Sequence, residues 1–289
     1  MPLVNSNAIL AHARKHKYGI PSLLAGNAEM IVGQIKAAES LNAPLILAFN
    51  QGATPTIPLE IGMALAADAA RKASVPVATI LDHGANIEQI VVAMRNGTSS
   101  VMFDGSTLPY EENVRQTQAI VSIAHAVGVD VEAELGGVGG SSIYLGDEGP
   151  GSSMTDPDQA VDFVERTGID VLAISFGNSH GVYRTKPVID LERVRAIHGR
   201  VSLPLVMHGG SGLEPDEYAA VIASGISKVC YYTVMGRAAS RTILQKMNET
   251  DPETLIYHQI IAQATDFFTQ ATKELMTLLG CAGKAAPGK

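Results

Sequence analysis

The sequence predicts an α/β protein whose parallel strands close into an eight-stranded barrel, and two observations favour that fold. Short apolar runs rich in β-branched residues alternate with longer amphipathic stretches along nearly the whole chain. This alternation is typical of repeated strand–helix units that build a parallel sheet. The length of 289 residues suits a single (β/α)8 TIM barrel, which typically needs about 250 residues.

Strand–helix units follow one another in a regular order. The strands are expected near Gly19–Leu23, Pro44–Phe49, Val77–Leu81, Ser99–Phe103, Asp130–Glu134, Val171–Ser175, Leu205–Met207 and Lys228–Tyr231. The helices are expected near Asn27–Leu41, Ile57–Ala73, Ile87–Asn96, Tyr110–Val127, Pro157–Thr167, Leu191–His198, Pro215–Ser224 and Gly236–Met247. Such a series favours a closed barrel over an open doubly wound sheet, which usually has fewer strands and a G-x-G-x-x-G turn after the first.

The whole chain, residues 1–289, is expected to form one domain, because no linker divides it. Its end predicts an extra pair of helices at Tyr257–Leu279 and a flexible tail at Cys281–Lys289. The longest interruption, Gly136–Ser153, is rich in Gly and Ser and follows the fifth strand. A loop of that length is more often a functional lid than a defect, although a simple surface excursion is the alternative.

Composition and charge exclude several classes of partner. The net charge is −8 and no dense Lys/Arg run occurs, which argues against a nucleic-acid surface. No apolar run approaches the ~18 residues of a membrane helix, and the first residues do not resemble a signal peptide. The cysteines, Cys230 and Cys281, lie far apart and indicate no disulfide framework. We therefore expect a cytoplasmic protein.

Three histidines follow strands at equivalent positions, and each precedes a glycine. They are His83, His180 and His208, after the third, sixth and seventh strands. The catalytic groups of a parallel barrel lie just past the carboxyl ends of its strands. Three imidazoles with an open fourth position are the ligand set of a catalytic zinc ion. A lone histidine would more often be a packed polar residue, but three at matched positions favour a divalent metal.

Carboxylates accompany these histidines. Asp82 could move a proton beside the metal or could only orient a ligand imidazole, and its position does not separate the two roles. Glu132 and Glu134 share one face of the fifth strand. At least one should approach the ion or accept from a ligand histidine, because an unpaired buried carboxylate is costly. Asp104 is another orienting candidate, with a turn or cap residue as the alternative.

A small glycine-rich loop follows the seventh strand and predicts a phosphate site. Ser211 lies in this loop beside Gly209, and Thr233 follows the eighth strand. Barrels commonly bind phosphate at these two loops, through backbone N–H groups and a helix N-terminus.

Together these motifs resemble the class II, metal-dependent ketose-bisphosphate aldolases, which include fructose-bisphosphate and tagatose-bisphosphate aldolases. The likeness runs in the same order from about the first strand to the eighth. The matching segments are Leu81–Gly84, Met102–Ser106, Val131–Gly136, Thr155–Pro157, His180–Tyr183 and Pro204–Gly212.

The resemblance implies a fold, a reaction and a site. It implies that the three histidines bind zinc, that Asp82 is the general acid/base and that Glu134 lies near the ion. It also implies that the phosphate of dihydroxyacetone phosphate lies among Gly181, Gly209, Ser211 and Thr233, with a monovalent cation beside it in some relatives. The reaction would be reversible cleavage of a phosphorylated ketose in carbohydrate metabolism, by a homodimer or homotetramer.

Three departures from the family pattern concern the substrate. Leu24 lies in the segment Ile20–Leu24, where relatives usually have a Phe-Asn pair, although Asn27 is retained. Ser141 and Ser142 stand where relatives carry an acidic residue of the mobile loop, and the nearest acids are Asp147 and Glu148. Cys230 replaces an asparagine that normally contacts the triose, and a thiol cannot reproduce the donors and acceptor of an amide. We therefore expect poor activity on fructose 1,6-bisphosphate.

Two other functions are compatible with the same residues. A metal-dependent sugar-phosphate isomerase or epimerase would use the same barrel and ion but release no aldehyde. A catalytically impaired relative could bind a metabolite; Leu24 and Cys230 favour it, and the intact Asp82 and histidines oppose it. The C-terminal helices could supply an interface in either case.

Overall fold

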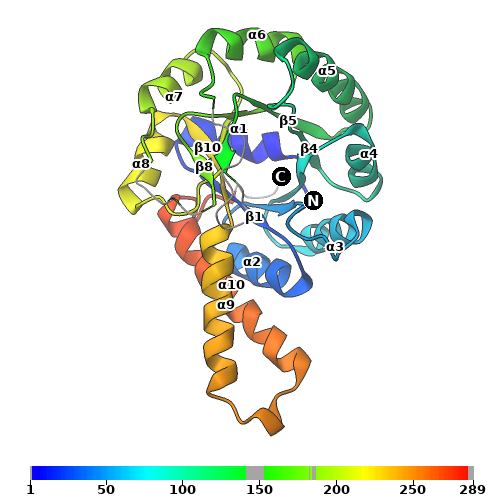
Figure 1. Ribbon diagram of the computed structural model, residues 1–289, viewed down its shortest axis with the longest axis vertical. Coiled ribbons are helices and arrows are strands. Elements are labelled where there is room, and N and C mark those ends of the chain that lie inside the picture. The colour runs from blue at the N-terminus through cyan, green and yellow to red at the C-terminus, as the bar shows by residue number, and fades with distance from the viewer. Residues whose placement is uncertain (1, 141–152, 182, 184–186, 286–289) are drawn as a thin grey trace.

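The protein, seen in a computed structural model that describes residues 2–140, 153–181, 183 and 187–285, is a closed barrel of parallel strands (Figure 1). The strand order around the barrel is β1-β10-β9-β7-β5-β4-β3-β2. The barrel strands are β1 (Ile20–Leu24), β2 (Leu45–Phe49), β3 (Val77–Gly84), β4 (Ser100–Phe103), β5 (Asp130–Leu135), β7 (Val171–Ile174), β9 (Leu205–Met207) and β10 (Ile226–Tyr231). The predicted (β/α)8 barrel is thereby confirmed.

Two short strands lie outside the barrel sheet. β6 (Gly139–Gly140) pairs in parallel with β8 (Ser179–His180). This pairing was not predicted, because two-residue strands carry no alternating pattern. It joins the segment after β5 to the one after β7, at the carboxyl ends of the barrel strands.

Helices surround the barrel (Figure 1), and in the described part of the chain one follows each barrel strand from β1 to β9. They are α2 (Ala28–Ser40), α3 (Leu59–Lys72), α4 (Ile87–Arg95), α5 (Tyr110–Ala126), α6 (Pro157–Thr167), α7 (Leu191–His198) and α8 (Pro215–Ser224). Several of these helices begin at a capping residue, whose side chain accepts a hydrogen bond from a free backbone N–H group of the first turn. Asn27 accepts from the N–H of Met30, and Asp156 accepts from the N–H groups of Asp158 and Gln159. These caps fix where each helix leaves its loop.

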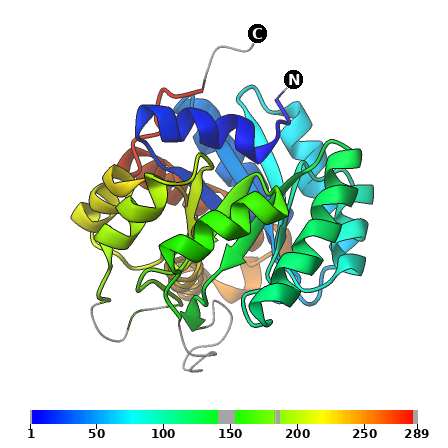
Figure 2. The same cartoon turned by 90° about the horizontal axis from the view of Figure 1, so that it is seen from above.

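Helix α1 (Ser6–His16), which we did not predict, lies across the amino-terminal end of the barrel (Figure 2). The side chain of Asn5 donates to Asp130 Oδ1 at 2.9 Å, at the start of β5. Arg14 donates to the carbonyl oxygens of Val201 and Leu203, just before β9. Helix α1 also contacts β3 and β10, and together with the anchors near β5 and β9 these contacts span the barrel, so α1 covers this end.

The C-terminal region differs from the expected helix pair. After α9 (Thr233–Asn248) and a short 3-10 turn (Pro252–Thr254), one continuous helix, α10 (Tyr257–Leu278), returns to the barrel. The prediction of two helices within Tyr257–Leu279 was wrong, because no Gly or Pro interrupts α10. The distal halves of α9 and α10 form an arm that projects from the barrel (Figure 1).

Helix α10 packs closely on α2, and the start of the expected tail follows it. A Cβ on Gly33 of α2 would lie 2.6 Å from the carbonyl oxygen of Thr265 in α10. Beyond α10, Cys281 and Ala285 are buried, and the N–H of Ala285 donates to the carbonyl oxygen of Asn42. The expectation of a flexible tail therefore does not fit residues 281–285. No described helix is long and apolar enough to span a bilayer.

Candidate metal centre and substrate pocket

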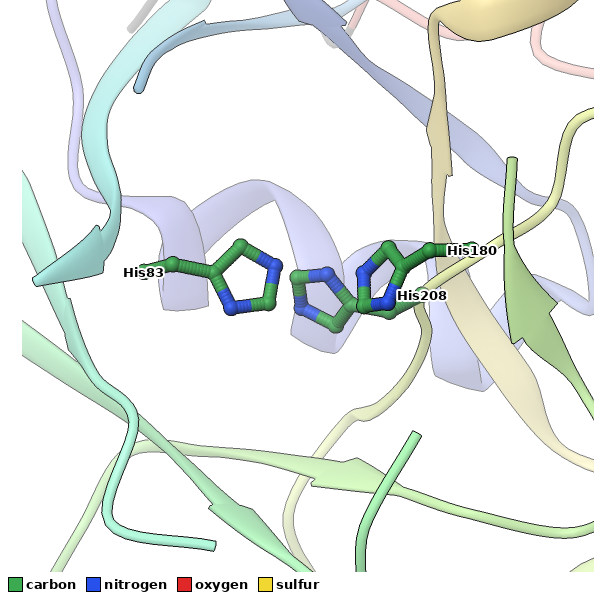
Figure 3. A group of neighbouring side chains, drawn as sticks. All are labelled: His83, His180 and His208. Atoms are coloured by element: carbon green, nitrogen blue, oxygen red, sulfur yellow. The ribbon is translucent and has the colours of Figure 1, made fainter. Parts of the chain in front are cut away.

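Three histidine rings from distant parts of the chain meet at the carboxyl ends of the barrel strands (Figure 3). His83 is the residue before the last in β3, His180 lies in β8 and His208 directly follows β9. Their ring centroids are 4.6 to 5.7 Å apart. One nitrogen of each ring lies within 4.8 Å of the others. This spacing is compatible with three ligands around a single ion.

The backbone around two of the histidines has an unusual conformation. His83 has a φ of +52°, and the register of β3 against β4 shifts between Leu81 and Gly84. A left-handed backbone is uncommon for a residue with a Cβ and is found mostly at turns and functional sites. Gly209 also has a positive φ, and a Cβ there would lie 2.2 Å from the carbonyl oxygen of Ser179. Only glycine permits this close approach beside His208.

Asp104 contacts the ring of His83. The Nδ1 atom of His83 lies 2.8 Å from Asp104 Oδ2, while Asp104 Oδ1 accepts from the Ser106 hydroxyl at 2.7 Å. Burial would raise the pKa of Asp104, but the hydrogen bond and charge of His83 hold it well below its usual range. An ionised Asp104 accepts from Nδ1–H, which leaves the Nε2 lone pair of His83 free for an ion.

Glu132 contacts His208 from inside the barrel. Glu132 Oε1 lies 3.0 Å from the Nε2 atom of His208, and Oε2 accepts from the ammonium of Lys228 at 2.6 Å. Burial opposes ionisation of Glu132, but the charge of Lys228 lowers its pKa below the ordinary value. Sequence reasoning missed Lys228, because it cannot show which strand residues face each other across a barrel.

The third ring, His180, has no comparable partner. Its Nε2 atom is buried and has no hydrogen-bond partner among the described residues. Burial, together with His83 and His208, lowers the pKa of His180 to about 3. Burying an imidazole nitrogen without a hydrogen-bond partner destabilises the fold, unless a ligand such as a metal ion binds that nitrogen. The donor set therefore fits a divalent metal ion.

Asp82 lies beside the three rings. Its Oδ1 atom is buried and has no partner within the described part of the chain. Burial tends to raise the pKa of Asp82, but His83, His208 and Lys228 together lower it. Asp82, His208 and Cys230 also place one possible ligand atom each within 4.8 Å of one another. An ionised carboxylate at this place can accept a proton from a bound substrate.

Glu134 belongs to another group of possible ligands, in which one atom each of His83, Asp104 and Glu134 lies within 4.8 Å of the others. Its Oε1 atom accepts from the N–H of Val138 at 3.2 Å, while Oε2 has no partner among described atoms. Burial and then Asp104 raise the pKa of Glu134 to about 6. No Lys or Arg among the described residues forms an ion pair with this carboxylate, so a metal ion close to His83 would stabilise its charged form.

A pocket opens above the histidines. The residues expected to surround a phosphate, Gly181, Gly209, Ser211 and Thr233, all line it. The Ser211 hydroxyl accepts from the N–H of Tyr232 at 3.0 Å, next to the start of α9. The remaining lining residues are Ser22, Leu24, Ala48, Asn50, Ala53, Asp82, His83, His180, His208, Cys230, Tyr231 and Tyr232.

The pocket contains two of the three departures from the family pattern. Leu24 and Cys230 both line it, and the thiol of Cys230 lies 3.8 Å from the Nε2 atom of His208. Asn50 also lines it, a residue that sequence reasoning missed although it directly follows β2. The third departure, Ser141 and Ser142, lies outside the described residues.

The expected lid is described only at its two ends. Gly139–Gly140 pairs with Ser179–His180, and Gly137 pairs with Ser153. The base of this segment is thereby fixed beside His180. The candidate loop acids Asp147 and Glu148 lie outside the described residues.

Comparison with known proteins agrees with this fold and donor set. The family model for class-II fructose-bisphosphate aldolases matches residues 4–284. The chain therefore belongs to the class-II fructose-bisphosphate aldolase family, whose members are in general metal-dependent. It is an aldolase, a lyase that breaks a carbon–carbon bond.

Individual relatives cover nearly the whole chain. The fructose-bisphosphate aldolase of Thermus caldophilus is 34% identical over 98% of this chain and 100% of its own. The YdjI protein of Escherichia coli K12 is 38% identical over 94% of this chain and 95% of its own. The crystal structure of the YdjI aldolase has a TM-score of 0.86 at 33% identity and covers 98% of this chain and 100% of that chain.

Proposed function

We propose that the protein is a zinc-dependent aldolase that reversibly cleaves a phosphorylated ketose into dihydroxyacetone phosphate and an aldehyde. The observation that carries this proposal is the meeting of three histidine rings beside Asp82, under a pocket lined by a glycine-rich loop. His83, His180 and His208 would hold the ion, with Glu134 close by. A zinc ion there supplies Lewis-acid polarisation of a carbonyl and stabilises the negative charge that develops on it.

Asp82 has the central role among the protein's own groups. In cleavage, its carboxylate takes the proton from the hydroxyl that becomes the aldehyde, and the carbon–carbon bond breaks toward the triose fragment. The electron pair is shared between the triose carbon and the adjacent carbonyl oxygen until that carbon is protonated. No Schiff base is needed. Lys228 is unsuited to one, because its ammonium is fully buried and paired with Glu132.

The phosphate end of the substrate is assigned to the loops after β9 and β10. Gly181 and Gly209 let the backbone approach a ligand closely. Thr233 is the first residue of α9, and the Ser211 hydroxyl accepts from the N–H of Tyr232, just before that helix. Backbone N–H groups and the helix dipole favour an anion there.

The substrate is inferred to differ from fructose 1,6-bisphosphate. Leu24 and Cys230 place an apolar side chain and a thiol where the family pattern has two amides. A substrate hydroxyl at these positions would lose its partner, which typically costs about 1–3 kcal/mol. We therefore infer that the substrate is another phosphorylated ketose, such as a deoxy or acidic sugar.

Metal analysis combined with a screen of phosphorylated ketoses tests this function. We expect about one zinc ion per chain and release of dihydroxyacetone phosphate, measured by a coupled assay, from at least one ketose. Asp82→Ala should abolish release while the zinc content remains. Isomerisation without release of dihydroxyacetone phosphate would contradict the proposal, as would turnover that survives complete chelation.

Two further properties belong to the proposal. The cytoplasm is inferred from the two separate, unpaired cysteines. A homodimer or homotetramer is inferred from the arm, where Leu244, Ile256 and Tyr257 expose 59%, 49% and 79% of their surface. The molar mass in solution, measured by light scattering, tests the oligomeric state.

A further inference from the structure

A lysine lies fully buried inside the barrel, beneath the histidine cluster. Lys228 on β10 has 0% exposure, and its ammonium donates to Glu132 Oε2 at 2.6 Å. Glu132 lies on β5, and β7 and β9 separate the two strands in the sheet. The ion pair therefore crosses the barrel interior. Lysine is almost never fully buried without such a partner, so this position calls for an explanation.

The second oxygen of Glu132 contacts the metal-site histidine. Oε1 lies 3.0 Å from the Nε2 atom of His208, and both side chains are 1% exposed. An ionised carboxylate can only accept, so Nε2 must carry the proton in this contact. The lone pair of His208 is then on Nδ1. One carboxylate thus determines both the orientation of the ring and the nitrogen that remains available to an ion.

Glu132 can serve this purpose only if its charge is balanced and its position is fixed. A buried carboxylate without a cation is strongly destabilising, and removing one partner of a buried pair leaves that cost unrelieved. Lys228 supplies the cation and holds Oε2, which leaves Oε1 directed at His208. The ammonium does not line the substrate pocket, so a direct contact with substrate is not its role.

We propose that Lys228 is a positioning residue for metal binding, which acts through Glu132 to fix the orientation and tautomer of His208. The inference rests on the proposed function in one respect, that His208 binds an ion. It adds a residue on β10 that neither the histidine pattern nor the pocket identifies.

The decisive variant is Lys228→Met, which removes the charge and keeps a similar volume. We expect zinc affinity, measured by competition with a chromophoric chelator, to fall about 10- to 100-fold, the usual effect of losing a group behind a ligand. The visible spectrum of the cobalt(II)-loaded protein should also change, because the geometry around His208 changes. Ser227→Ala is the matched control: Ser227 is the neighbouring buried residue of β10 and its hydroxyl has no described partner.

A second variant keeps the test informative if Lys228→Met does not fold. The double variant Glu132→Gln/Lys228→Met removes both charges, so no unpaired charge is buried. It should fold, as judged by circular dichroism and thermal unfolding, and should still bind zinc more weakly than the parent.

Each result decides the proposal. Parental zinc affinity and an unchanged cobalt spectrum in a folded Lys228→Met protein would overturn it, and so would parental affinity in the double variant. A parent that binds no zinc, cobalt or other divalent ion would instead contradict the proposed function. Normal binding in the parent and Ser227→Ala, with weakened binding in Lys228→Met, supports the inference.

Discussion

The three histidines of the candidate metal centre are held in different ways. Asp104 contacts His83 and Glu132 contacts His208, whereas the Nε2 atom of His180 has no described partner. Two rings therefore have their orientation set by carboxylates before any ligand arrives. We infer that His180 is ordered mainly by the ion and by the β6–β8 pairing.

Cys230 is the residue with the clearest expected effect on substrate choice. Its thiol lines the pocket 3.8 Å from His208. Cys230→Asn restores an amide with two donors and one acceptor. We expect kcat/KM for fructose 1,6-bisphosphate to rise about ten-fold, the equivalent of one good hydrogen bond. Steady-state kinetics measure this.

The matched control for this substitution is Cys281→Ala, because Cys281 is buried beyond α10, away from the pocket. It should leave kcat/KM unchanged. An unchanged or lower kcat/KM in a folded, metal-loaded Cys230→Asn protein would contradict the role assigned to this position.

Glu134 gives the metal-free protein a specific pH dependence. Burial and Asp104 raise its pKa to about 6, above the ordinary value of 4.5, so the folded chain binds this proton more tightly than the unfolded chain. The protonated Glu134 carboxyl therefore contributes its full stabilisation of the fold below pH 4.5, and this stabilisation is lost as the pH rises through about 6. Glu134→Gln cannot ionise, so the variant does not lose stability in this way. Relative to the parent, its free energy of unfolding should rise by about 2 kcal/mol between pH 4.5 and pH 7.

Urea unfolding at both pH values in the presence of a chelator tests this pH dependence. Glu60→Gln, at an exposed carboxylate of α3, is the matched control. A difference between Glu134→Gln and the parent that stays constant from pH 4.5 to pH 7 would show that Glu134 is not perturbed as the structure indicates.

At the scale of elements, the contact between α2 and α10 explains how the C-terminal helix is held to the barrel. Gly33 leaves no room for a side chain, since a Cβ would lie 2.6 Å from the backbone oxygen of Thr265. Gly33→Ala must push the helices apart. We expect the free energy of unfolding to fall by about 1–3 kcal/mol, the usual cost of overpacking. Chemical denaturation measures it.

Gly199 provides the control for this contact. It ends α7 with an ordinary right-handed backbone, and a Cβ there would meet its nearest neighbour at 3.4 Å. Gly199→Ala should change stability little. Equal stability of Gly33→Ala and the parent would mean that α2 and α10 are not packed as closely as described.

Elements with a strong local pattern were predictable from the sequence. The ranges Pro157–Thr167, Leu191–His198 and Pro215–Ser224 agree with α6, α7 and α8, because Pro near the start and capping acids mark their beginnings. Helix α1 was missed because it precedes the first strand, outside the strand–helix repeat that identified the other helices. The single helix α10 was divided in two, because length alone suggested a pair.

The candidate site was only partly predictable, because the sequence shows where a strand ends but not which side chains meet across the barrel. The position of a residue at a strand end can be read from the sequence, and this identified His83, His180 and His208. Contacts across the barrel interior depend on register and on the closure of the sheet. The Lys228–Glu132 pair and the pocket position of Asn50 therefore required the structure.

At the scale of the whole molecule, the proposed ion links segments that are far apart in the chain. Its ligands come from β3, β8 and the end of β9, so binding should stabilise the fold against unfolding. A ligand at 100 times its dissociation constant contributes about 2.7 kcal/mol. Removal of the metal should therefore lower Tm by several degrees, as measured by calorimetry with and without a chelator. In His180→Ala, the chelator should have little effect.

The placement of α1 across one end of the barrel affects how substrate enters and products leave. Asn5 and Arg14 fasten this helix to the starts of β5 and β9, so the interior is reached from the opposite rim. The same opening would then serve the sugar substrate, both products and the metal ion. We therefore expect the fragment bound deeper in the pocket to leave after the outer one.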